Sequence, residues 1–497
     1  MPNFEGTALI RLTPALLILA APAFSARAAE PVSFNRDIRP ILSDNCFACH
    51  GFDSKHREAG LRLDTFEGAT TERDGVKAIA PGDPENSELL SRIGSDDPDL
   101  LMPPKKSHKP PLTVEQRAKF KLWIEQGAKY DEHWAFIPPA RPPTGGAEGS
   151  AAVDRFVTRK LDEAGLKMSP EAAPETLIRR VTLDLTGLPP TIAEIDAFVT
   201  ASAGDADGAY RELVDRLLQS PHYGERWGRW WLDQARYADS NGYSIDAPRQ
   251  IWKYRDWVVA ALNADMPFDE FTIEQLAGDL LPDAGQSQNI ATGFHRNTQI
   301  NQEGGIDVEQ FRVDSVFDRV ATTGSVWLGL SIGCAQCHDH KFDPITQKEY
   351  YQFFAFLNNQ DEPTMKVFDP DVNVGDLKAE FKELGDKLTV FLKEQADELD
   401  EWEAGLTPEI KKSLTPEVNH ALAVPKAKRS LAHLRTLYAS GAGAVGAFRQ
   451  WNDRYTELDA ILNQGVTTLV MKERPTPRKS TILIKGDFTR PSDEVAP

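Results

Sequence analysis

The chain of 497 residues is long enough to enclose more than one hydrophobic core, and we expect roughly two to four structural units. Its 41% hydrophobic and 26% charged residues are typical of a globular protein and exclude the collagen-like and disordered classes. The formal charge of −19 argues against binding to nucleic acid or anionic lipid, because both require clustered lysine and arginine side chains.

Residues 1–28 are predicted to form a signal peptide. Arg11 precedes an apolar stretch, Thr13–Phe24, and the small-x-small sequence from Ala26 to Ala28 follows it. This stretch of twelve residues is shorter than the about 20 that a helix needs to span a membrane, and no later stretch is apolar enough. We therefore expect cleavage after Ala28, export to the periplasm or beyond, and no transmembrane segment.

The four cysteines form two Cys-x-x-Cys pairs, and a histidine directly follows each pair. Two thiols at this spacing form thioether bonds to the two vinyl groups of one porphyrin, while the adjacent imidazole binds the iron. The sequence therefore predicts two covalently attached haem c groups. Their attachment cysteines and proximal histidine ligands are Cys46, Cys49 and His50 in the first motif and Cys334, Cys337 and His338 in the second.

Three other uses of the cysteine pairs compete with haem attachment: a thioredoxin-like redox pair, a four-thiolate zinc site and a disulfide framework. Zinc is the strongest of these alternatives. It requires two pairs that are 285 residues apart to converge, and it leaves both histidines unexplained.

The first unit is predicted to span residues 30–135. Phe34, Ile38, Ile41 and Leu42 recur at helical spacing and lead into the first motif. Near the end of the unit, Thr113 to Gln116 form a capping box, and Gly127 ends the helix. The apolar side chains expected on one face of this helix are Val114, Ala118 and Leu122.

Met102 is the predicted sixth ligand of the first iron. It is the only methionine between the signal peptide and residue 168, and prolines follow it. A thioether ligand raises the potential of haem, which suits electron transfer. The alternatives are that Met102 fills a gap in the core, or that His56 or His108 is the ligand.

The first unit resembles the planctomycete-type cytochrome c domain. The resemblance rests on Cys46 to His50, Gly60 to Asp64, Pro81 to Ser87, Met102 to Pro104 and Trp123 to Ala128. It implies a small helical cytochrome c-like fold with histidine and methionine ligation.

A Pro- and Gly-rich linker at 136–150 precedes a larger unit, predicted at 151–360 and mainly α-helical. The last of its predicted helices, about Asp307 to Leu330, leads through Gly333 into the second motif. The helices are predicted at 154–165, 174–187, 192–202, 210–219, 224–238, 250–264 and 307–330.

His295 is the predicted sixth ligand of the second iron, because His340 follows His338 too closely to reach the opposite face of the haem. Met266, His222 and an open coordination position are the alternatives.

Two clusters in this unit have more than one interpretation. Five tryptophans between Trp227 and Trp257 indicate either a core or a surface that packs on haem or stacks against a sugar. The second cluster is polar, and several of its members are also expected on a solvated helix face. It comprises Asn297, Asn301, Glu303, Asp307, Glu309, Arg312, Asp314 and Asp318.

The larger unit resembles the uncharacterised domain that accompanies the planctomycete-type cytochrome domain, and no activity is implied. The resemblance rests on Arg180 to Pro190, Tyr223 to Trp227, Thr298 to Gly305, Trp327 to Leu330 and Cys334 to Phe356.

Residues 361–465 are predicted to form a helical hairpin, from about Val374 to Glu403 and from about Thr415 to Leu462, that serves as a spacer. Residues 466–497 are predicted to begin with two short strands. Because proteins of the resembled family continue into another large domain, we expect this segment to be the start of a truncated C-terminal domain. The expected fold class is mainly α with a short β segment.

The leading functional hypothesis is an exported dihaem c-type cytochrome that exchanges electrons with a redox partner protein in the cell envelope. It is either an electron carrier or a haem-dependent oxidoreductase subunit that acts on a carbohydrate or another small molecule. The alternative is a monohaem cytochrome fused to a non-catalytic ligand-binding module, for example one for carbohydrate.

Overall fold

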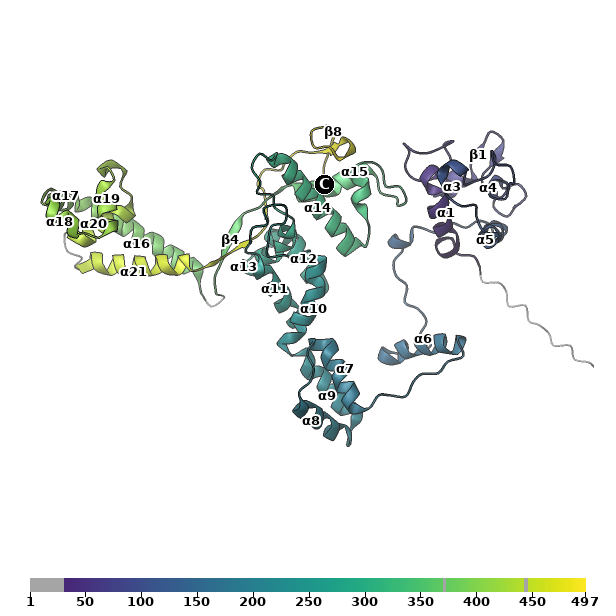
Figure 1. Ribbon diagram of the computed structural model, residues 1–497, viewed down its shortest axis with the longest axis horizontal. Helices are drawn as coiled ribbons and strands as arrows, with labels where there is room; N and C mark the ends of the chain where they lie inside the picture. Colours follow the sequence, from purple (N-terminus) through teal and green to yellow (C-terminus); the bar gives the residue numbers. More distant parts are fainter. Residues whose placement is uncertain (1–30, 370–371, 442–445) are drawn as a thin grey trace, which may run out of the picture. The chain divides into compact units, whose positions relative to one another are not determined.

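The computed structural model describes residues 31–369, 372–441 and 446–497 (Figure 1). The predicted signal peptide lies outside these residues. Helix accounts for 57% of the structure and strand for 6%, so the mainly α fold class is confirmed. No helix within the described ranges is both long and apolar enough to cross a membrane.

Contacts divide the chain into two compact units. The first extends to Pro143 and includes the short segment His340–Pro344. The second comprises Thr144–Asp339 and Ile345–Pro497.

The first unit is built from short helices around one apolar core. The predicted helix before the first motif is confirmed, because Phe34, Ile38, Ile41 and Leu42 are all buried. Two short strands, β1 (Glu72–Arg73) and β2 (Val76–Lys77), pair with each other. The helices are η1 (Phe34–Ile38), α1 (Arg39–Asn45), α2 (Phe47–His50), α3 (Phe66–Thr70), α4 (Glu88–Ile93), η2 (Lys105–Ser107), α5 (Val114–Glu125) and η3 (Trp134–Phe136).

Helix α5 begins at the predicted capping box, in which Thr113 and Gln116 bond to each other's backbone, but its predicted buried face is wrong. Val114 is 67% exposed and Leu122 is 36% exposed. Phe120 and Trp123 are buried instead, together with Ile124. The two rings bury much more apolar area than the aliphatic row does, and their burial therefore sets the orientation of the helix.

In the second unit, the six predicted helices between 154 and 264 are present, with ends that differ by a few residues. Helix α7 ends at Gly187, whose φ of 73° favours glycine, and α8 begins at a capping box of Thr191 and Glu194. The observed helices are α6 (Gly149–Glu163), α7 (Pro174–Thr186), α8 (Ile192–Ser202), α9 (Ala206–Leu218), α10 (Pro221–Gln234) and α11 (Trp252–Asn263).

The main core of this unit lies where α11 meets the helices that follow it. Tyr254, Phe271 and Phe294 are buried there with Trp257. The tryptophan cluster is split, because Trp230 is 53% exposed. The surrounding helices are α12 (Phe268–Ala277), η4 (Gly278–Leu280), α13 (Gln286–Ala291), η5 (Thr292–Asn297), α14 (Val308–Thr323), η6 (Gly324–Leu328), η7 (Ile332–Gln336) and α15 (Gln347–Asn358).

The predicted hairpin is a cluster of helices rather than two continuous ones. Helices α16 (Val374–Glu394) and α21 (Gly446–Asn463) pack side by side, as Figure 1 shows. The second predicted helix is interrupted, because Pro425 cannot continue a helix beyond Ala423. The helices between α16 and α21 are α17 (Ala396–Ala404), α18 (Pro408–Ser413), α19 (Pro416–Ala423), η8 (Lys426–Lys428) and α20 (Leu431–Gly441).

The two predicted C-terminal strands are present, but they pair with other segments and not with each other. Strand β5 (Val466–Leu469) pairs antiparallel with β4 (Thr364–Val367), so the helices from α16 to α21 are inserted between two paired strands. Strand β6 (Lys472–Glu473) pairs with β3 (Gln360–Asp361). Strand β7 (Ser480–Leu483) pairs with β8 (Pro491–Val495) around a short turn, η9 (Ile484–Gly486).

Candidate haem sites and a polar pocket

The first motif forms a tight helical turn at the end of α1. The backbone N–H groups of Cys49 and His50 both donate to the carbonyl oxygen of Cys46, at 3.0 and 2.8 Å. All four cysteines of the chain are in described residues, and each is a free thiol. Burial, and secondarily the neighbouring Cys49, raises the pKa of Cys46 to about 12, so this thiol is protonated at neutral pH.

The predicted ligands of the first iron meet in one cavity of about 310 Å³. Cys46, His50 and Met102 all line it, and Leu63 and Ile93 contribute to its apolar walls. Burial lowers the pKa of His50, although Glu58 acts in the opposite direction. The imidazole is therefore neutral at pH 7, which is the form that binds a metal.

These residues fit a covalently bound haem c. The motif supplies free thiols, the cavity is largely apolar, and the proximal imidazole is neutral with a buried Nδ1 atom that makes no hydrogen bond. The alternative ligands fit less well, because His56 bonds to Asp53 at the surface and His108 is exposed.

The second motif lies in a more open setting. Cys334 and Cys337 are both exposed, and Cys337 donates a hydrogen bond of 3.2 Å to the carbonyl oxygen of Lys485 in the turn between β7 and β8. Nδ1 of His338 lies 2.6 Å from the carbonyl oxygen of Asp339. A carbonyl oxygen only accepts, so Nδ1 carries a proton. This is the tautomer of a histidine that binds a metal through Nε2.

Comparison with known families assigns both regions of the chain. Residues 46–106 match planctomycete cytochrome C. Residues 152–362 match the model of a protein of unknown function, DUF1549, in the order that the resemblance predicts. The chain is a cytochrome-like haem-binding protein. Comparisons with curated proteins and with solved structures found no match.

His295, the predicted sixth ligand of a second iron, is buried in the core of the second unit. Its ring packs edge-to-face against Phe294, and its backbone carbonyl accepts a hydrogen bond of 2.9 Å from Arg319. Burial, and secondarily the charge of Arg319, lowers the pKa of His295 to about 3. The second motif contacts Lys485 and Tyr351, and the role of His295 as its ligand stays a prediction.

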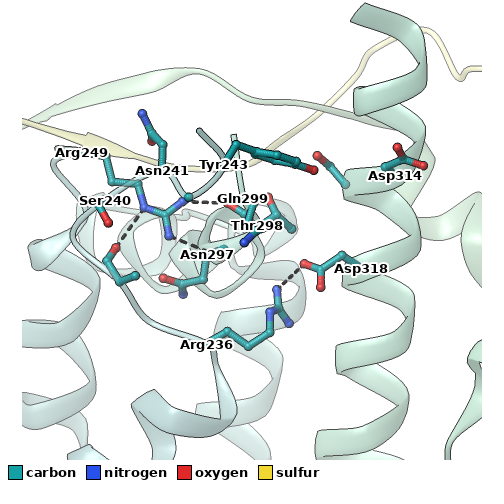
Figure 2. A pocket seen from close by; sticks show the side chains of 13 residues that line it. Arg236, Ser240, Asn241, Tyr243, Arg249, Asn297, Thr298, Gln299, Asp314 and Asp318 are labelled. Carbon is teal, nitrogen blue, oxygen red and sulfur yellow. Dashed lines mark hydrogen bonds and ion pairs between the residues drawn. The ribbon is translucent and has the colours of Figure 1, made fainter. Parts of the chain in front are cut away.

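The second unit also contains a polar pocket of about 390 Å³ that was not predicted from the sequence (Figure 2). Three segments that are distant in sequence form it: 236–249, 297–299 and 314–318 on α14. The lining residues are Arg236, Ala238, Ser240, Asn241, Gly242, Tyr243, Arg249, Asn297, Thr298, Gln299, Asp314, Ser315 and Asp318.

A loop closed by backbone bonds forms one wall of this pocket. The backbone N–H of Asn241 donates to Ala247, its carbonyl oxygen accepts from Ile300, and an isolated bridge joins Ser240 to Pro248. Arg249 stabilises this wall of the pocket. Its guanidinium donates to four backbone carbonyl oxygens, those of Ala238, Arg296, Asn297 and Thr298.

An ion pair joins the two sides of the pocket. Nη2 of Arg236 and Oδ2 of Asp318 lie 2.8 Å apart, and Figure 2 shows the two side chains pointing toward each other. Burial raises the pKa of Asp318, although Arg236 and Arg319 lower it. Burial also raises the pKa of Asp314, one turn earlier on α14, despite a hydrogen bond from Gln310.

Three residues of this pocket were singled out in the sequence, although the pocket itself was not predicted. Asn297, Asp314 and Asp318 belong to the polar cluster predicted from the sequence, but Arg312 bonds to Asn358 and Glu309 instead. Arg236 and Tyr243 were not predicted as pocket residues, because they are distant in sequence from α14 and no motif joins them to it. Both residues are non-glycine with positive φ, 59° and 60°, a conformation that also occurs at other described positions.

Proposed function

We propose that this protein is an exported dihaem c-type cytochrome that transfers electrons to or from a redox partner protein in the cell envelope. The observation that carries the proposal is the apolar cavity lined jointly by Cys46, His50 and Met102. A haem that only carries electrons has protein ligands at the iron and no open position, and His50 and Met102 would supply these ligands.

The four residues of the first site have different proposed roles in holding the haem. Cys46 and Cys49 would hold the porphyrin by thioether bonds, so that the group is retained in both oxidation states of the iron. His50 would be one protein ligand of the iron, through a neutral imidazole, and Met102 would be the other. When bound, haem c supplies the one-electron exchange.

The second motif supports a second haem. The His338 tautomer, with its proton on Nδ1, suits a proximal ligand, and the exposed thiols of Cys334 and Cys337 are accessible to the attachment machinery. His295 is proposed as the sixth ligand, and moving its buried ring to the iron requires a rearrangement of the core.

Counting covalent haem tests this proposal. The full-length protein is produced with a c-type maturation system, and haem per chain is measured as the pyridine haemochrome. We expect two haems for the wild type and one each for the double variants Cys46→Ala/Cys49→Ala and Cys334→Ala/Cys337→Ala. The N-terminal sequence of the exported protein should begin at Ala29.

One haem per chain, unchanged in the Cys334→Ala/Cys337→Ala variant, would overturn the dihaem proposal. The alternative would then hold: a monohaem cytochrome fused to a ligand-binding module. If both haems are present, reaction of the ferrous protein with carbon monoxide distinguishes the remaining versions. An inert protein is an electron carrier, whereas binding at the second iron indicates an open position and a redox-enzyme subunit.

A further inference from the structure

The polar pocket of the second unit carries an inference that does not depend on how many haems are bound. We propose that it is a binding site for a neutral ligand rich in hydroxyl groups, of the size of a monosaccharide. Its volume of about 390 Å³ lies in the range of small-molecule sites.

Buried polar atoms that are not fully satisfied gather at this pocket. Nη1 of Arg236 and Oδ1 of Asn297 are buried and make no hydrogen bond, whereas Nη2 of Arg236 and Oδ2 of Asp318 are held by their mutual ion pair. A buried polar atom without a partner costs about 1–3 kcal/mol, so two such atoms at one pocket need an explanation. A ligand that bonds to them supplies one.

The character of these atoms defines the ligand chemically. Arg236 offers donors, whereas Asp318 and Asn297 offer acceptors. A hydroxyl group both donates and accepts, so vicinal hydroxyls can satisfy both kinds of atom at once. The side chains of Arg236 and Asp318 are 29% and 40% exposed, and both residues line the cavity.

The charges at the pocket favour a neutral ligand over an ionic one. The guanidinium of Arg236 is already paired with Asp318, and that of Arg249 is occupied by four backbone carbonyls. Neither arginine among the residues that line the pocket is therefore left to bind an anion. The carboxylate of Asp314 has a hydrogen bond from Gln310, and burial disfavours its charged form.

Tyr243 provides an apolar surface of the kind that stacks on the C–H face of a sugar. Tyr243 as a whole is 41% exposed, and its ring packs edge-to-face against Phe311 at 5.4 Å between centroids. Its backbone has a φ of 60° and follows Gly242, whose φ is 74°. The left-handed conformation is strained for a residue other than glycine. Such strained residues cluster at binding and active sites, where a side chain must be held in one position.

Calorimetric titration of the full-length haem-loaded protein tests the proposal. The probes are two matched sets: glucose, glucuronate and glucosamine, and galactose, galacturonate and galactosamine. We expect at least one neutral sugar to bind with at least tenfold higher affinity than its acidic and amino counterparts. Tyr243→Ala and Asp318→Asn should each weaken that binding by about tenfold or more.

Matched controls exclude general damage to the fold. Tyr210, on α9, is 38% exposed, and Asp256 forms an ion pair with Arg255 at 45% exposure. Tyr210→Ala and Asp256→Asn should therefore leave affinity within about twofold of the wild type. The proposal is overturned if no neutral sugar binds at millimolar concentration, if a charged counterpart binds more tightly, or if the pocket variants bind as the controls do. None of these results alters the haem count.

Discussion

Nη1 of Arg296 donates a hydrogen bond of 2.7 Å to the carbonyl oxygen of Val470, a residue 174 positions later in the chain. The same nitrogen donates to Pro363 at 2.9 Å, and the N–H of Met471 donates to the Thr292 hydroxyl. The chain after the helical insert therefore supports η5, the helix that ends at the pocket residue Asn297.

Substitution of Glu362 should destabilise the second unit. Its carboxylate forms ion pairs with Arg319 and Arg296, whose side chains are only 2% and 5% exposed. Glu362→Gln leaves both guanidinium groups buried without a counter-charge, and we expect a loss of about 2–4 kcal/mol in the free energy of unfolding. Urea denaturation, monitored by circular dichroism, measures this loss in the free energy of unfolding. The control is Glu309→Gln. Glu309 pairs with Arg312, but its side chain is 59% exposed, so this substitution should cost under about 1 kcal/mol.

The Glu362 effect should also depend on pH. Burial raises the pKa of Glu362, but the charges of Arg319 and Arg296 lower it by more. The net pKa therefore lies below its ordinary value. The stabilisation is therefore complete above the unfolded pKa of about 4.5 and is lost as the pH falls through the folded value. The difference between wild type and Glu362→Gln should shrink below about pH 4. A difference that grows on acidification would contradict this assignment.

Two adjacent tyrosines on α15 should respond differently to loss of their hydroxyl groups. The hydroxyl of Tyr351 lies within 3.1 and 3.3 Å of the carbonyl oxygens of Gln336 and Leu483, whereas the buried hydroxyl of Tyr350 has no hydrogen-bond partner. Tyr351→Phe should cost about 1 kcal/mol, and Tyr350→Phe should be neutral or stabilising. Thermal and urea unfolding of both variants checks this, and equal losses would refute it.

Two glycines of α10 form a similar pair. A Cβ atom on Gly224 would overlap the carbonyl oxygen of Val259 on α11, whereas one on Gly228 would meet a Val259 methyl group at 3.3 Å. Gly224→Ala should destabilise by about 1–3 kcal/mol despite the better helix propensity of alanine. Gly228→Ala should stay within about 0.5 kcal/mol of the wild type. The reverse order in urea unfolding would mean that α10 and α11 do not pack closely at Gly224.

Replacing Met102 should lower the reduction potential of the first haem. Loss of the thioether ligand removes its stabilisation of the ferrous form, and we expect a fall on the order of 0.1–0.2 V in Met102→Ala. A spectroelectrochemical titration measures it, and a change of the ferric spin state should accompany it. Met168→Leu is the control, because Met168 is 52% exposed. An unchanged potential in Met102→Ala would assign the sixth position to another residue.

Local chemistry explains why the helices of this protein could be predicted from its sequence. The capping boxes at Thr113 and Thr191 and the glycine at position 187 act within a few residues, and each marks a helix end in the structure. The first haem attachment motif was predicted for a similar reason, because thioether chemistry fixes the spacing of Cys46, Cys49 and His50.

Features that depend on tertiary contacts could not be predicted in this way. The inward face of α5 depends on where Phe120 and Trp123 find space, and the apolar row of Val114 and Leu122 misidentified it. The pairing of β5 with β4 joins segments separated by a cluster of helices. The pocket likewise requires Tyr243 to approach α14, and no local rule encodes that approach.

The pairing of β4 with β5 also bears on how this chain can change length. Val367 and Val466 are partners in one ladder, so the inserted helices leave and rejoin the unit at neighbouring positions. Residues can be gained or lost between these partners without shifting the register of the strands, because the closure entropy of a longer segment rises only slowly. The insert is thus a place where relatives can diverge in size while the rest of the second unit, including the pocket, keeps its framework.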